Sequence, residues 1–162
     1  MKAVIVYAST HHGNTKKVVE QMAEILSADL IDITKNQKPN ISSYDIVGLA
    51  SGIYFHSFDE KLKAFISNNN FQRHQKVFLV ATCGVRYMDY TKKIEKILKE
   101  KQIECLGSFQ CRGYDTYGIL AKLGGIAKQH PSAKDLKKAK DFVRKIKSKS
   151  LYNKFKFTYK NS

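Results

Sequence analysis

AVIVYASTHHGNTKKVV, residues 3–19, places a short polar turn between two apolar segments of different periodicity. The first six residues form an almost continuous apolar run, which is typical of a strand buried on both faces of a parallel sheet. After the turn, apolar residues recur with the spacing of one helix face: Val18, Val19, Met22, Ile25 and Leu26. The stretch therefore predicts a strand that is followed at once by a helix, with Asn14 or Thr15 as the helix N-cap.

The rest of the chain continues this alternation. Further strands are expected at 29–34, 44–50, 76–82 and 103–111, and further helices at 57–67, 89–101 and 132–146, the last capped by Ser132 with Asp135 in its first turn. Alternation of this kind predicts an α/β domain with a five-stranded parallel sheet and helices on both of its faces.

Length and composition fit one cytoplasmic domain. The chain has 162 residues, no apolar run long enough to cross a bilayer, and no signal-type N-terminus. Its three cysteines, Cys83, Cys105 and Cys111, lack the spacing of a zinc site or a disulfide framework, so no metal is expected.

The charge balance is strongly basic, at a formal +15. Such a balance suits an acidic partner, nucleic acid or an anionic membrane, and it also suits a lysine-rich solvated surface. We expect the folded domain to span residues 1–148 and a basic, aromatic tail to span 149–162. Two alternatives stay open for the tail, which either contacts a membrane surface or packs its aromatic residues on the domain.

The polar turn has the composition of an anion site. Ser9 and Thr10 supply hydroxyl groups, and Gly13-Asn14-Thr15 opens a helix, whose free N–H groups and dipole favour a phosphate. The motifs of nucleoside triphosphatases and of dinucleotide-binding folds are absent from this turn. In an open parallel sheet, ligands bind beyond the carboxyl ends of the strands. There the turn should meet SGIYFHS (51–57), TCGVRY (82–87) and the glycine-rich connection at 112–130.

The stretch YASTHHGNT, residues 7–15, resembles the phosphate loop of the flavodoxin family. The resemblance implies a flavodoxin-like, doubly wound sheet with strand order 2-1-3-4-5 and FMN as the cofactor. It also implies three groups of cofactor-binding residues. They are Ser9, Thr10, His11, His12, Gly13, Asn14 and Thr15 around the phosphate and ribityl chain; Ser51, Gly52, Ile53 and Tyr54 in the first ring-flanking loop; and Thr82, Cys83, Gly84 and Tyr87 in the second.

The resemblance implies a redox protein that acts as an electron carrier, and the basic charge then suggests an acidic, ferredoxin-like partner protein rather than nucleic acid. No catalytic side chain is expected, because the flavin carries the chemistry. Two other functions stay open: an FMN-dependent oxidoreductase acting on a quinone or a porphyrinogen, and a non-redox binding module with an acidic partner.

Overall fold

The computed structural model describes residues 1–36, 38–116 and 124–160, with side chains described as far as residue 150. The strands are β1 (Ala3–Ala8), β2 (Asp29–Asp32), β3 (Ile46–Tyr54), β4 (Ser57–Phe58), β5 (Lys76–Cys83) and β6 (Glu104–Arg112). The helices are α1 (Asn14–Leu26), α2 (Glu60–Asn68), α3 (Lys92–Glu100) and α5 (Ala133–Lys160). Five strands pair in parallel in the order β2-β1-β3-β5-β6, which confirms the predicted doubly wound sheet.

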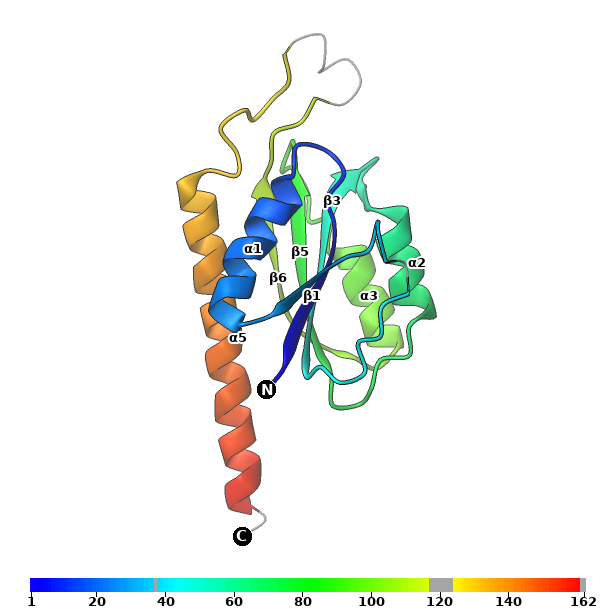
Figure 1. Cartoon of the computed structure of the whole chain (residues 1–162), viewed down its shortest axis with the longest axis vertical. Coiled ribbons are helices and arrows are strands. Elements are labelled where there is room, and N and C mark those ends of the chain that lie inside the picture. The colour runs from blue at the N-terminus through cyan, green and yellow to red at the C-terminus, as the bar shows by residue number, and fades with distance from the viewer. Residues whose placement is uncertain (37, 117–123, 161–162) are drawn as a thin grey trace.

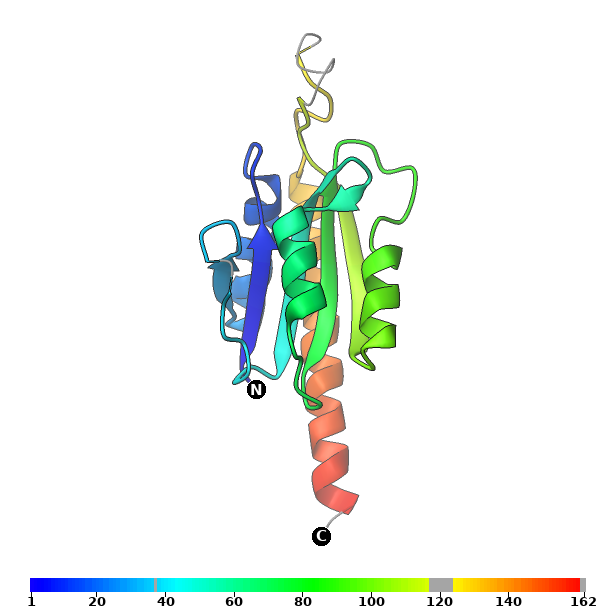
Figure 2. The same cartoon turned by 90° about the vertical axis from the view of Figure 1, so that its right-hand side faces the viewer.

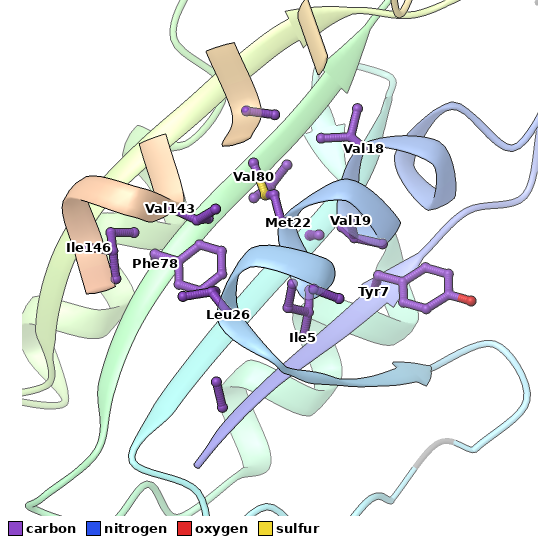
Figure 3. Packing of buried hydrophobic residues seen from close by; sticks show 14 of the residues in the cluster. Ile5, Tyr7, Val18, Val19, Met22, Leu26, Phe78, Val80, Val143 and Ile146 are labelled. Atoms are coloured by element: carbon purple, nitrogen blue, oxygen red, sulfur yellow. The ribbon is translucent and has the colours of Figure 1, made fainter. Parts of the chain in front are cut away.

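Helices cover both faces of the sheet, with α1 and α5 on one face and α2 and α3 on the other (Figures 1 and 2). This arrangement explains the continuous apolar run of β1. Ile5 and Tyr7 lie in the core under α1 and α5, whereas Val4 and Val6 lie in the core under α2. Figure 3 shows Met22 of α1, Val143 of α5 and Phe78 of β5 meeting in the first of these cores.

Strand β3 is longer than the sequence predicted. Ser51, Gly52, Ile53 and Tyr54 were expected in a loop, but they continue the strand, because Gly52 pairs with Thr82 of β5 and Tyr54 pairs with Ser57 of β4. The short antiparallel strand β4 follows a two-residue hairpin loop, in which Phe55 and His56 both have positive φ. The predicted first ring-flanking segment is therefore a strand end and a hairpin.

Helix α5 runs to Lys160, although the sequence predicted a helix ending at residue 146. It thus continues through residues 148 and 149, where the boundary between domain and tail was predicted. Residues 117–123 of the glycine-rich connection lie outside the described residues. Over the ranges described, no helix is both long and apolar enough to cross a membrane.

Candidate functional site

A cavity of about 300 Å³ lies beyond the carboxyl ends of β1, β3 and β5. Ten of the fifteen predicted cofactor residues line it: His11, Asn14, Thr15, Gly52, Ile53, Tyr54, Thr82, Cys83, Gly84 and Tyr87. The topology therefore brings the three predicted segments together at one place. The cavity also has lining residues that were not predicted to hold the cofactor: Phe55, His56, Val85, Tyr90, Gly113, Tyr114 and Asp115.

The other five predicted residues do not line the cavity. The Ser9 hydroxyl accepts a hydrogen bond from the Lys16 N–H at 3.2 Å, and the Thr10 hydroxyl donates to the Tyr54 hydroxyl at 2.6 Å. Three more complete the set. His12 bonds the Thr116 hydroxyl at 2.7 Å, Gly13 is the helix N-cap, and the Ser51 hydroxyl accepts from the Asp59 N–H at 2.9 Å.

The start of α1 contributes polar groups to the cavity. The sequence predicted Asn14 or Thr15 as its N-cap, but the N-cap is Gly13, in a left-handed conformation and without a side-chain cap of its own. The Ser9 hydroxyl, four residues before Gly13, accepts from the N–H of the third helical residue instead. The prediction was wrong because this contact comes from a residue outside the usual N-cap position.

Asn14 and Thr15 turn inward instead. The Asn14 amide nitrogen donates to the Tyr114 carbonyl at 2.7 Å, and the Thr15 and Thr82 hydroxyls lie 2.8 Å apart. Asn14 is only 9% exposed, and its Oδ1 atom has no hydrogen-bond partner among the described residues. A buried acceptor without a donor is costly, so this atom indicates a ligand group that donates a hydrogen bond.

Another part of the cavity lining is aromatic. Tyr87 donates to or accepts from His56 Nδ1 at 2.6 Å, and this contact links the β3–β4 hairpin to the segment after β5. Tyr54 packs its ring over Gly52, where a Cβ atom would come within 2.6 Å of the Tyr54 hydroxyl. Phe55 is 80% exposed and Tyr87 is 62% exposed, so this part opens to solvent through large apolar groups.

The segment after β6 also lines the cavity, as the sequence predicted for the glycine-rich connection. Gly113, Tyr114 and Asp115 line the cavity, and Asp115 is held by paired backbone hydrogen bonds to Ile126. A Cβ atom at Gly84 would collide with the Asp115 carboxylate, so the two segments touch. Asp115 was missed because no local pattern marks it, and only the pairing with Ile126 brings it to the cavity.

Burial keeps two ionisable groups of the cavity lining neutral at pH 7. Burial raises the pKa of the Cys83 thiol to about 11, although Arg86 and Arg112 oppose the shift. Burial likewise raises the pKa of Tyr90 to about 12. The Cys83 thiol is therefore neutral at pH 7 and a poor nucleophile.

Comparison with known proteins identifies the fold and the family. A profile of the flavodoxin domain matches residues 4–123. An uncharacterized protein of Methanocaldococcus jannaschii is 39% identical over 148 residues, which is 90% of this chain and 98% of that protein.

Solved structures agree at low sequence identity. Flavodoxin 2 from Bacillus cereus aligns with a TM-score of 0.66 and 17% identity, over 92% of this chain and 99% of its own. Rubredoxin oxygen:oxidoreductase from Desulfovibrio gigas aligns with a TM-score of 0.70 and 14% identity, over 95% of this chain. This chain spans only 37% of that oxidoreductase. From the profile match, the chain belongs to the flavodoxin domain family, and this membership supports a flavin-binding redox role.

Proposed function

We propose that the cavity binds FMN and that the protein carries electrons between redox partners. The observation that carries the proposal is the mixed lining of the cavity. The start of α1 and the buried Asn14 acceptor contribute polar groups to it, and Tyr54 and Tyr87 contribute aromatic rings. This arrangement suits a ligand that joins a phosphorylated polyol chain to a flat aromatic ring.

The residues present fit each part of that ligand. The N–H groups of Asn14 and Thr15 have no acceptor among the described residues, and the α1 dipole favours a phosphate near them. The Asn14 Oδ1 atom can accept from a ribityl hydroxyl, and Tyr54 or Tyr87 can pack against a ring. Bound FMN would supply reversible electron transfer, while these side chains bind and orient it.

Two features favour a carrier over an enzyme with its own organic substrate. A volume of about 300 Å³ lies at the low end of the range for ligand cavities, so one FMN molecule would fill the space. The cavity lining includes the exposed apolar side chains of Phe55, Val85 and Tyr87, and such a surface can contact another protein. The net charge of +15 indicates that this protein partner is acidic.

Flavin titrations test the cofactor. FMN should bind more tightly than riboflavin, because only FMN engages the helix N-terminus. Tyr87→Ala should weaken both flavins alike by about ten-fold, the value of one aromatic contact. Met88→Ala is the matched control, since Met88 is exposed in the same segment but does not line the cavity. Equal affinity for FMN and riboflavin would contradict the proposed phosphate site.

Anaerobic assays test the carrier role. The FMN-loaded protein should exchange electrons with an acidic ferredoxin-type protein, and the rate should fall as salt rises because salt screens the attraction. It should react slowly with NAD(P)H, quinone and porphyrinogen. Fast reduction by any of these small molecules would instead favour the enzyme alternative.

A further inference from the structure

Exposed apolar side chains gather beside the cavity. Among the described residues six large hydrophobic side chains are exposed, and four of them belong to two neighbouring segments: Phe55, Val85, Tyr87 and Met88. Phe55 lies in the hairpin before β4, and the other three lie in the loop between β5 and α3, which Figure 2 shows arching away from the sheet. The hydrogen bond between Tyr87 and His56 joins the two segments. A cluster of this kind is typical of a surface that binds another molecule.

The backbone of the loop between β5 and α3 is held in place by side chains of the domain. The Tyr90 hydroxyl donates to the Val85 carbonyl at 2.9 Å, and the Gln110 amide nitrogen donates to the Met88 carbonyl at 2.8 Å. The Gln110 amide oxygen in turn accepts from the Tyr90 N–H at 3.1 Å. Because these contacts already order the loop, a partner that binds its side chains has less conformational entropy to remove.

A second hollow, of about 390 Å³, adjoins the cavity, since Tyr87 lines both. Two charged residues line this hollow, Arg86 and Asp89. The Asp89 carboxylate is engaged at the start of α3, where it accepts from the Thr91 N–H at 3.0 Å and from the Thr91 hydroxyl at 2.7 Å. Arg86 is exposed and makes no hydrogen bond or ion pair with another described residue. Its guanidinium is therefore the group of this hollow that can pair with an incoming carboxylate.

Charge and shape identify the partner. The formal charge of +15 repels a second copy of this chain and attracts an acidic protein. A flat anionic bilayer would leave the hollow empty, whereas a side chain that projects from a protein surface can fill it. An arginine within a cluster of exposed apolar and aromatic side chains is also the composition typical of the centre of a protein–protein interface.

We propose that Arg86 and the exposed side chains of Phe55, Val85, Tyr87 and Met88 form the docking surface for an acidic protein. A carboxylate of the partner pairs with Arg86 in the second hollow, and apolar side chains of the partner cover the rest. The choice of a redox protein as the partner rests on the proposed function, whereas the surface itself is built by the chain alone. A partner docked there contacts the lining of the cavity at Val85 and Tyr87.

Binding of a purified acidic ferredoxin tests the role of Arg86. Surface plasmon resonance should be recorded with FMN-loaded and with FMN-free protein. Arg86→Ala should raise the Kd about ten-fold, mainly through faster dissociation, because it removes a charge that is paired in the complex. Arg73→Ala is the matched control, since Arg73 is exposed before β5, whereas Arg86 follows the other end of that strand. It removes the same charge and should raise the Kd less than about two-fold.

A second pair of variants tests the apolar part of the surface. Met88→Ala should raise the Kd for the ferredoxin about five-fold, because it removes apolar area that the partner covers. Leu30→Ala, at an exposed residue of β2, should leave the Kd within about two-fold of wild type. Neither Arg86 nor Met88 lines the cavity, so FMN should bind both variants as tightly as wild type.

Three results would overturn the docking surface. They are the absence of ferredoxin binding to the wild-type protein, equal effects of Arg86→Ala and Arg73→Ala, and displacement of the ferredoxin by anionic phospholipid vesicles. A protein that fails to bind FMN but shows the expected differences between these variants would contradict the proposed cofactor and support the docking surface.

Discussion

Helices α1 and α5 begin at the same end of the sheet, near the carboxyl ends of its strands, and pack against each other (Figure 1). Their N-termini are nevertheless capped in different ways. At α5, the Ser132 hydroxyl accepts from the Asp135 N–H at 3.3 Å, and the Asp135 carboxylate accepts from the Ser132 N–H at 2.8 Å. His130 adds a third contact to that carboxylate at 2.6 Å. This reciprocal capping box leaves little for a ligand to satisfy.

The N-terminus of α1 has no such capping box. The N-cap Gly13 has no side chain, and Ser9 satisfies only the Lys16 N–H. Asn14, which occupies the first helical position, carries a buried acceptor without a partner among the described residues. A helix start can thus be capped for stability or left open for a ligand, and neighbouring helices of one domain can do both.

The largest effect is expected from a charge placed at the open helix start. Asn14→Asp should lower FMN affinity on the order of 100-fold relative to riboflavin, because a carboxylate near the phosphate repels it through a medium of intermediate dielectric. Losing the amide donor to Tyr114 affects both flavins, so the ratio of the two affinities isolates the charge. Asn70→Asp makes the same change at an exposed residue away from the cavity and should leave the ratio unchanged. Equal losses for FMN and riboflavin would show that the phosphate lies elsewhere.

A substitution in the capping box of α5 should change the stability of the protein and leave flavin binding unchanged. Asp135→Asn should lower the free energy of unfolding at pH 7 by about 1–2 kcal/mol, the typical value of a cap, while FMN affinity stays the same. Burial opposes ionisation of Asp135, but the hydrogen bonds from Ser132 and His130 prevail and lower its pKa below the usual 3.8. A depressed carboxyl pKa stabilises the folded state above about pH 4, and this contribution is lost as pH falls through the folded-state pKa.

Urea unfolding of Asp135→Asn and wild type at several pH values measures this effect. The difference between the two proteins should be full at pH 7 and should shrink below pH 4. Asp141→Asn is the control, because Asp141 lies on the same helix and makes only exposed pairs with Lys137 and Arg144. Such pairs contribute little to stability, because water and salt screen them. A difference between wild type and Asp135→Asn that persists undiminished at pH 3 would exclude the ionised cap as its source.

Most of the fold could be predicted because both faces of the sheet are covered. Buried parallel strands such as β1 and β5 leave continuous apolar runs, and the helices that cover them leave a clear periodicity. The hairpin of β3 and β4 left no such signal. Its two-residue loop usually carries glycine, asparagine or aspartate, whereas here Phe55 and His56 adopt positive φ.

The site could be predicted only in part, for a similar reason. Residues that follow directly after strands, such as Thr82 and Cys83, were found because topology alone brings them to one rim. Asp115 and the capping contact of Ser9 depend on tertiary geometry, which a linear pattern does not record. The predicted cofactor roles of individual residues remain predictions for the titrations above.

The smallest effect is expected at Gly13, the residue that keeps the start of α1 open. Its φ is +65°, and a Cβ atom added there would have no atom within 4 Å, so a substitution meets backbone strain without a clash. A left-handed alanine costs about 1–2 kcal/mol, and the lower entropy of the unfolded chain returns about 0.4–1 kcal/mol. Gly13→Ala should therefore lower the free energy of unfolding by about 1 kcal/mol. Gly13→Asn should change it by only a few tenths of a kcal/mol, since asparagine tolerates this conformation. Urea unfolding of the two variants separates strain from crowding: equal losses would mean that the added side chain, rather than the backbone angle, sets the cost.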